Sequence, residues 1–366
     1  MNITRSGRVM AIAAAVTVSA FVLTGCAANE APVEPTATPL NISGKLTGAG
    51  ASSQAAAEDA WIADFQMTNN LVDVTYDPTG SGAGRTAFIS GGVSFAGTDS
   101  YLSDKELAST FAACTPGTKV FEVPVYVSPI AVIYNVDGVT DLNLDASTIA
   151  KIFTGAITTW NDPAIVALNP KAKLPATAIT PVHRSDDSGT SKNFSDYLFQ
   201  NAKADWAIEK PADKFPFEVG EAAQGTAGVV AAVANGTGTI GYADASKVGK
   251  LTVANIKVGK EFVAYSPEGA AAVVAGSTAV AGRDKNDMAV DINRTTTDPK
   301  EYPLVLVSYA VGCTSYADAK VGPLVNAYIS YLVSEQGQAL AAKAAGAAPL
   351  SADVQKQAAA IAATIK

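Results

Sequence analysis

The stretch AITPVHRSDDSGTSKNFSDYLF, residues 178–199, predicts a strand, a polar turn and a helix in immediate succession. Its beginning has the composition of a strand. Its end places Phe194 and Tyr197 three positions apart, on one face of a helix. Between them, two aspartates and a run of glycine and hydroxyl residues follow Arg184. A strand that leads into a helix is the repeating unit of α/β folds, so the stretch predicts that fold class.

Strand-like and helix-like segments alternate along the rest of the chain. Short apolar runs typical of strands lie at residues 72–76, 93–98, 123–135, 239–243 and 302–312. Helical patterns lie at residues 53–65, 147–153 and 226–235, and in most of the chain after Tyr316. The sequence SDKE at 103–106 has the form of a capping box, which opens a further helix. This alternation predicts an α/β fold with largely parallel sheets.

Length, composition and charge limit the classes of protein that the chain can belong to. A chain of 366 residues, 48% of them hydrophobic, is long enough for two packed cores. Its formal charge of −8 disfavours nucleic acid as a partner, because nucleic-acid-binding proteins are usually basic. An anion site on such a chain has to be built locally. His183 is the single histidine and the cysteines lack metal-ligand spacing, so we expect no metal and no other cofactor.

The N-terminal residues have the pattern of an export signal. Arg5 and Arg8 precede an apolar run at residues 9–23, which is shorter than the roughly 20 residues that a membrane-spanning helix needs. The run ends in LTGC, which resembles the lipobox of bacterial lipoprotein precursors. That resemblance implies removal of a signal peptide, residues 1–25, and attachment of a lipid to Cys26. The alternative is an ordinary secretory signal with an incidental cysteine.

Two further features of the sequence concern the mature, exported chain. Residues 26–41 are rich in Pro, Ala and Thr and are predicted to form an extended tether. Cys114 and Cys313 are the cysteines that remain besides Cys26. Two cysteines of an exported protein are expected to form a disulfide. The alternative is a pair of buried free thiols.

Four segments share one pattern, in which a strand or loop leads through glycine and hydroxyl residues toward a helix. They are GAGASSQ at 48–54, TGSGAGR at 79–85, FAGTDS at 95–100 and DSGTS at 187–191. Helix starts leave backbone N–H groups without intrahelical partners and have a partial positive charge. Several such starts at one point would form an anion site without net positive charge. Each segment by itself also fits an ordinary helix cap.

Together, these segments resemble the phosphate-binding proteins of bacterial phosphate-specific ABC importers. The resemblance covers nearly the whole mature chain and includes LTGAGAS, GSGAG, FAGTDSYLSD, VPVYVSPIAVIYN, VHRSDDSGTS and GTIGYAD. The pair IFTGAITTWND and RSDDSGTS is particular to this family. It implies the two-lobed periplasmic-binding-protein fold of type II, an α/β fold in which two chain crossovers form a hinge. The implied lobes comprise residues 42–122 with 303–366, and residues 123–302.

The resemblance also implies which residues contact phosphate. The contacts fall on Ser52, Ser53, Ser81, Asp99, Arg184, Ser188, Gly189 and Thr190. Ser53 stands where the family often has phenylalanine, so the contact there is expected from the backbone N–H. Asp186 matches the acid that pairs with the arginine, and it would orient the guanidinium group. Asp187 is expected to face solvent or to cap the helix that follows.

Asp99 is the acid that would give the site its ion selectivity. Near neutral pH phosphate carries at least one proton, whereas sulfate carries none. Asp99 can therefore accept a hydrogen bond from phosphate but would repel sulfate, and such a site rejects the wrong ion by on the order of 10⁴-fold. Without the resemblance, Asp99 would be interpreted as a turn or N-cap residue.

The function expected from the resemblance is high-affinity binding of inorganic phosphate outside the cytoplasmic membrane and its delivery to an ABC permease. We expect a monomer without enzymatic activity, held by its lipid at the extracytoplasmic face of the cell membrane. One alternative is an exported hydrolase of phosphate esters, with His183 and Ser188 as its candidate residues. The lack of a GxSxG pattern and the expected opposite orientation of His183 and Arg184 disfavour it. The other alternative is a receptor for a different tetrahedral oxyanion.

Overall fold

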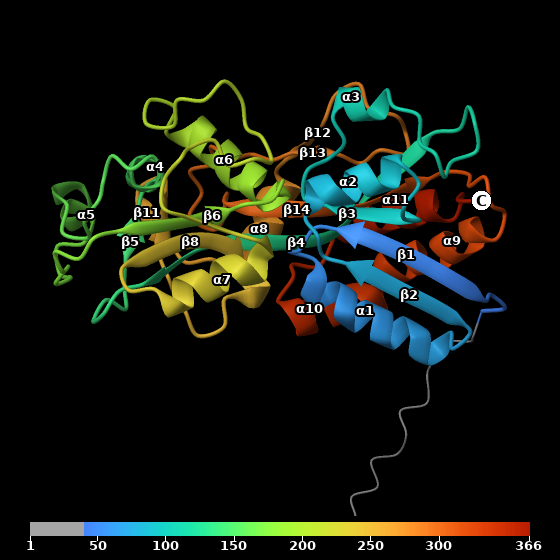
Figure 1. Ribbon diagram of the computed structural model, residues 1–366, viewed down its shortest axis with the longest axis horizontal. Helices are drawn as coiled ribbons and strands as arrows, with labels where there is room; N and C mark the ends of the chain where they lie inside the picture. The colour runs from blue at the N-terminus through green and yellow to red at the C-terminus, as the bar shows by residue number, and fades with distance from the viewer. Residues whose placement is uncertain (1–39) are drawn as a thin grey trace, which may run out of the picture. The chain divides into compact units, whose positions relative to one another are not determined.

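The computed structural model describes residues 40–366 of the chain. The main element of the fold is a nine-stranded mixed sheet (Figure 1). Its strands are, in spatial order, β2 (Val72–Asp77), β1 (Gly44–Gly50), β3 (Phe95–Thr98), β14 (Val305–Cys313), β4 (Val120–Asn135), β8 (Thr239–Asp244), β6 (Thr180–Arg184) and β7 (Glu221–Ala223), with β9 (Thr252–Val253) paired to β4 off this path. Each strand segment predicted from the sequence overlaps one of these strands. The expected signal peptide and Cys26 lie outside the described residues, as does most of the tether.

Two long neighbouring strands, β4 and β14, occupy the middle of this sheet. β4 pairs with β14 from Val120 to Pro129 and with β8 from Ile130 to Asn135, so it belongs to both halves of the sheet. These two pairings, and that of β14 with β3, are antiparallel, whereas β1, β2 and β3 pair in parallel, as do β6, β7 and β8. The expectation of largely parallel sheets is therefore wrong in the centre, because β14 returns in the direction opposite to β4.

Helices with apolar faces cover the first half of the sheet. They are α1 (Ala55–Thr68) and α2 (Ser81–Ile89), joined at the end of the chain by α9 (Val321–Leu332), α10 (Glu335–Ala345) and α11 (Ala352–Ala362). Trp61 and Phe65 lie four positions apart on α1 and are both buried, as the helical spacing predicts. α10 packs beside α1, so the predicted helical end of the chain returns to the first half (Figure 1).

An aromatic cluster forms the core of the second half. The helices of this half are α4 (Ala146–Phe153), α6 (Gly189–Asn201) and α7 (Gly225–Asn235). Phe194 of α6 stacks on Tyr242 of β8, with ring centroids 4.1 Å apart, and Phe153 of α4 meets both rings edge-on or tilted. Trp206 and Phe215 pack against the same cluster. Burial of these large rings fixes α6 against the sheet, and α6 begins at the turn quoted above.

The remaining elements are short. They are α3 (Asp104–Leu107), β5 (Asn143–Leu144), α5 (Pro163–Leu168), the 3₁₀ turn η1 (Ala245–Lys247), β10 (Asn255–Val258), β11 (Glu261–Val263), α8 (Pro267–Ala275), β12 (Thr278–Ala279) and β13 (Val290–Asp291). The predicted capping box is present at α3, where Ser103 and Glu106 exchange side-chain and backbone hydrogen bonds. Among the described helices, none is both long and apolar enough to cross a membrane.

A disulfide joins Cys114 to Cys313 and confirms the predicted pairing; the two sulfur atoms are 2.00 Å apart. Cys313 is the last residue of β14, and Cys114 lies in the segment between α3 and β4. The two cysteines are 199 residues apart in sequence, and closing so long a loop is expected to stabilise the fold by about 5 kcal/mol. The bridge ties the returning strand to the first half of the sheet.

Candidate anion-binding site

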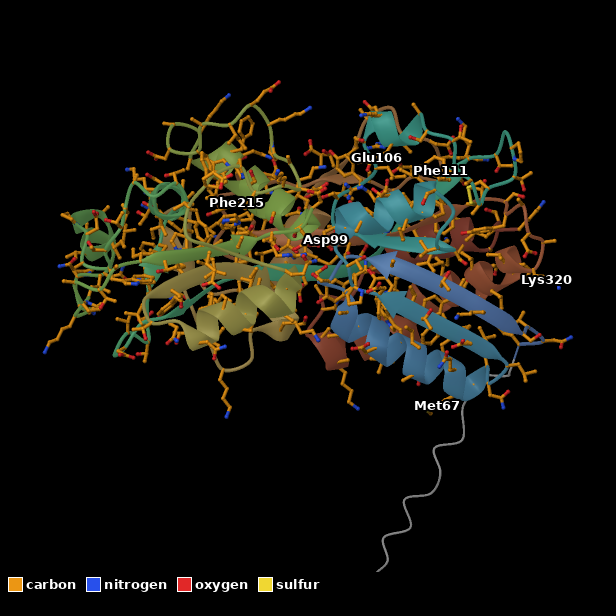
Figure 2. The ribbon with its side chains drawn as sticks, in the orientation of Figure 1. Met67, Asp99, Glu106, Phe111, Phe215 and Lys320 are labelled. Carbon is orange, nitrogen blue, oxygen red and sulfur yellow. A yellow bond between two sulfur atoms is a disulfide. The ribbon has the colours of Figure 1, made fainter. Side chains whose placement is uncertain are left out.

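Four helices begin near the place where the two halves of the sheet meet. α1 and α2 follow β1 and β2 in the first half, and α6 and α7 follow β6 and β7 in the second. In each half these strands are parallel, so their carboxyl ends, and the helix starts that follow them, lie at one edge. Asp99 follows β3, and Figure 2 shows it in the region between the halves. The predicted segments therefore converge where the two halves meet.

Asp99 is a buried carboxylate surrounded by hydroxyl donors from both halves. Its Oδ1 accepts hydrogen bonds from Ser53 Oγ and Ser308 Oγ, each at 2.6 Å, and its Oδ2 accepts one from Thr190 Oγ1 at 3.1 Å. Its own backbone N–H donates to Ser81 Oγ at 3.1 Å. Burial raises the pKa of Asp99 above its usual range, although the hydroxyl bonds and the charge of Arg184 oppose that rise. Asp99 thus lies among the other predicted site residues.

Arg184 is oriented by the acid two positions further along the chain. Its Nε donates to Asp186 Oδ1 at 2.8 Å, and its Nη2 donates to Asp186 Oδ2. Asp186 Oδ1 also accepts the backbone N–H of Gly225, the first residue of α7, at 2.9 Å. Burial alone would raise the pKa of Asp186, but the hydrogen bonds and charge of Arg184 outweigh it and lower the pKa. The guanidinium is buried, and its Nη1 has no hydrogen-bond partner among the described residues.

The start of α6 brings backbone donors against Asp99 and Ser81. Ser188 caps the helix by accepting the N–H of Ser191 at 3.2 Å. The N–H groups of Gly189 and Thr190 have no acceptor within the described part of the chain. A Cβ atom at position 189 would lie 2.6 Å from Asp99 Cβ and 2.7 Å from Ser81 Oγ, so only glycine allows this approach. The two halves are in contact at this point.

Ser52 makes its contacts with a residue that the sequence reasoning missed. Ser52 Oγ accepts the backbone N–H of Thr226 at 3.0 Å and lies 3.0 Å from Thr226 Oγ1. Thr226 is the second residue of α7 and follows a glycine, as in the four predicted segments, so that pattern could have identified it. Ser308 was also missed. It lies within the buried strand β14 and has no local sequence signal.

Ser53 and Asp187 complete the predicted set. Ser53 is fully buried, and its hydroxyl, rather than its backbone alone, takes part in the site through the bond to Asp99. Asp187 is exposed, which fits the expectation that it faces solvent. Its backbone carbonyl accepts the N–H of Gly82 in α2 at 2.9 Å and adds a contact between the halves.

The two residues considered for hydrolysis are engaged separately. The ring of His183 stacks on Phe215, with centroids 4.1 Å apart, and its Nδ1 lies 3.0 Å from the carbonyl oxygen of Arg184. Ser188 Oγ accepts from the backbone of α6. The described residues contain no group of three or more metal-ligating side chains. The arrangement therefore offers several N–H and O–H donors, one arginine and one acceptor, which suits a small anion that carries a proton.

Comparisons with known proteins give concordant results. A family model described as a PBP superfamily domain matches residues 33–336. The chain is 36% identical over 321 residues to a Mycobacterium leprae protein named phosphate-binding protein PstS 3. The alignment covers 84% of this chain and 86% of that protein. It is 36% identical over 344 residues to a protein of the same name from Mycobacterium tuberculosis, with 90% of each chain covered.

Solved structures show a similar fold. A high-affinity periplasmic phosphate-binding protein, bound with phosphate, superimposes with a TM-score of 0.70 at 22% sequence identity, covering 87% of this chain and 93% of that one. A phosphate-binding protein from Stenotrophomonas maltophilia gives a TM-score of 0.65 at 22% identity, with 87% and 94% covered. At these identities the likeness concerns the fold, and it agrees with the two-lobed type that the sequence predicts.

Proposed function

The chain belongs to the PstS family of phosphate-binding proteins, within the PBP superfamily, and we propose that it binds inorganic phosphate outside the cytoplasmic membrane and delivers it to an ABC permease. The observation that carries the proposal is the position of Asp99. This acid is buried at the meeting of the two halves, between hydroxyl groups and the start of α6. A site built for a fully deprotonated anion would have no use for such an acceptor.

The chemistry of the site matches phosphate group by group. The N–H groups at the starts of α1, α2 and α6, the hydroxyls of Ser81 and Ser188, which act as acceptors within the protein, and Arg184 would donate to the phosphate oxygens. Asp99 would accept the hydrogen bond of the protonated oxygen. Sulfate has no such proton and would meet the Asp99 carboxylate with an unshielded negative oxygen. A receptor for another oxyanion and an exported hydrolase are not favoured.

We propose that the molecule works as two lobes, residues 42–122 with 303–366 and residues 123–302, joined by the chain crossovers. The switch of β4 from one pairing partner to the other supports a division into two lobes, although it lies between Pro129 and Ile130, about seven residues after the proposed boundary. Hydrogen bonds between the lobes run through site residues, such as Thr190 with Asp99 and Ser52 with Thr226. Hinge closure over phosphate would make these contacts, and opening would release the ion.

The remaining parts of the proposal concern where and with what the protein acts. We propose that Cys26 carries a lipid that holds a monomer at the extracytoplasmic face of the cell membrane, that permease subunits take up the phosphate, and that the protein is not an enzyme. The lipobox and the tether support the anchor. Replacing Cys26 (Cys26→Ala) should release the protein from washed membranes, and a variant that stays bound would contradict the anchor.

Equilibrium binding to the delipidated mature protein tests the central proposal. Titration calorimetry should show one saturable site for phosphate, with sulfate weaker by on the order of 10⁴-fold. Incubation with a phosphate ester should release no phosphate. Absence of phosphate binding, equal binding of both ions, or turnover of the ester would each contradict the proposed function.

A further inference from the structure

One carboxylate of the second half reaches across to the first half beside the site. Asp213 lies in the segment between α6 and β7. Its Oδ2 accepts a hydrogen bond from Arg85 Nη2 at 2.5 Å, and its Oδ1 accepts one from Ser100 Oγ at 2.6 Å. Arg85 belongs to α2, and Ser100 directly follows Asp99. Neither partner is among the residues expected to touch phosphate.

Each end of this connection is attached to a part of the anion site. Arg85 lies one helical turn after Ser81 on α2, and the backbone carbonyl of Asp213 accepts the N–H of Ser188 at 3.0 Å. Arg85 is also held within its own half, because Nε donates to Glu106 at 2.7 Å and Nη1 donates to Thr98 Oγ1 at 3.0 Å. The guanidinium is thus held by contacts of its own half in addition to its contact with Asp213.

This ion pair differs from the others in where it lies. The remaining five ion pairs between described residues each join two residues of the same proposed lobe, whereas Arg85 and Asp213 belong to different lobes. The exposed fractions of their side chains are 7% and 16%. Burial alone would raise the pKa of Asp213, but the charges of Arg85 and Lys192 and the hydrogen bonds of Ser100 and Arg85 outweigh it and lower the pKa. The carboxylate is therefore ionised.

We propose that Asp213, Arg85 and Ser100 form a latch between the lobes, and that this latch sets the phosphate affinity by stabilising the closed form without touching the ion. The inference rests on the proposed function. Apparent affinity scales with the fraction of molecules in the binding-competent form, so a contact made only on closure strengthens binding. Loss of such a contact should act on dissociation, because phosphate leaves only from the open form. The latch residues are positioning residues.

Binding kinetics of single and double variants test the latch. Asp213→Ala and Arg85→Ala remove the two charges one at a time, and the double variant removes both. Asp213→Asn keeps the shape of the side chain without its charge. Asp205→Ala is the matched control, because Asp205 pairs with Lys151 at 3.7 Å within a single lobe. Calorimetry gives the phosphate and sulfate affinities, stopped flow gives the two rate constants, and thermal melting reports whether each variant is folded.

The latch predicts a specific pattern of results. Asp213→Ala should weaken phosphate binding about ten- to a hundred-fold, the range expected for charge-assisted hydrogen bonds. The change should lie in the dissociation rate, with the association rate and the phosphate-to-sulfate ratio unchanged. Asp213→Asn should give an intermediate loss, and Asp205→Ala should bind like the wild type. The double variant should bind phosphate as tightly as the single variant with the lower affinity, because either change breaks the same contact.

Two kinds of failure can be told apart. If the wild-type protein binds phosphate and a folded Asp213→Ala protein releases it at the wild-type rate, the latch is overturned while the proposed function stands. If Asp213→Ala lowers the phosphate affinity only by slowing association, the latch is overturned as well. If Asp213→Ala does not fold, Asp213→Asn and Arg85→Ala decide by the same criteria. If the wild-type protein itself does not bind phosphate, the proposed function fails, and the latch inference with it.

Discussion

Asp99 and Asp186 are two acids of the candidate site, one from each half of the sheet, and they have different partners. Asp186 has a cation, Arg184, at hydrogen-bond distance. Asp99 has hydroxyl partners, and the charge of Arg184 acts on it without a hydrogen bond between them. Burial favours the neutral form of both acids. At Asp186 the arginine outweighs burial and lowers the pKa, whereas at Asp99 burial prevails and the pKa stays raised.

The difference fits the two roles that we propose for aspartate in the same site. An acid whose charge is balanced by a cation holds that cation in place and does not respond to the ligand. An acid that is buried without such a partner gains most from sharing a proton, and a protonated oxygen of phosphate supplies one. Under the proposed function, the first half would contribute the group that distinguishes the anions, and the second half would contribute the group that attracts any anion.

Removal of the cation should have the largest effect. We expect Arg184→Ala to weaken both phosphate and sulfate by at least about 100-fold, because it removes a charge-assisted donor and leaves Asp186 buried without its cation. Titration calorimetry with both ions measures this. The double variant Arg184→Ala with Asp186→Asn removes the uncompensated charge as well and should fold better but bind no more tightly. Lys203→Ala, an exposed cation of the same half, is the control. A loss limited to one ion would contradict the assigned roles.

Removal of the charge of Asp99 should have a smaller effect on phosphate and a clear effect on selectivity. In Asp99→Asn the amide can turn its NH₂ group toward an unprotonated oxygen. We therefore expect phosphate binding to persist, sulfate binding to rise, and the ratio of their affinities to fall by about tenfold or more. Asp187→Asn, which changes an exposed acid of the same site, should leave the ratio unchanged. A wild-type ratio in Asp99→Asn would mean that Asp99 is a turn residue and that selectivity has another origin.

Glu58 is a third buried acid, and it has no cation at hydrogen-bond distance among the described residues. Glu58 of α1 accepts one hydrogen bond, from Tyr328 Oη at 2.7 Å, and its Oε1 has no hydrogen-bond partner in the described structure. Burial raises its pKa from 4.5 to about 8. The folded state therefore retains the proton that the unfolded state has lost. The stability contributed by this group is complete below pH 4.5 and is lost as the pH rises toward about 8.

The substitution Glu58→Gln should remove this pH dependence. Between about pH 7 and about pH 8.5 the wild-type protein should lose about 1 kcal/mol of unfolding free energy relative to the variant. Urea unfolding at the two pH values measures the difference, and phosphate affinity should not change. Asp73→Asn, an exposed acid on β2, is the control. Parallel pH profiles for the wild type and Glu58→Gln would show that Glu58 titrates normally.

Much of the fold and part of the site could be predicted from the sequence, because the interactions concerned are local. Arg184 and Asp186 are two positions apart, so the turn that contains them brings the carboxylate to the guanidinium. The alternation of strands and helices, the capping box at α3 and the glycine-rich helix starts are likewise properties of short segments. The disulfide was predictable because an exported chain with two further cysteines leaves few pairing choices.

Which distant groups meet depends on the tertiary structure. Ser308 reaches Asp99 from 209 residues away, and Arg85 reaches Asp213 over 128. The antiparallel centre of the sheet has the same origin, since strand order and direction are set by the path of the whole chain. Such contacts leave no pattern in a short segment, because a buried serine in a strand has the same local sequence whether it faces an apolar core or a carboxylate. The sequence determined the kinds of groups available for an anion, and the crossing of the chain between the two halves determined which of them surround Asp99.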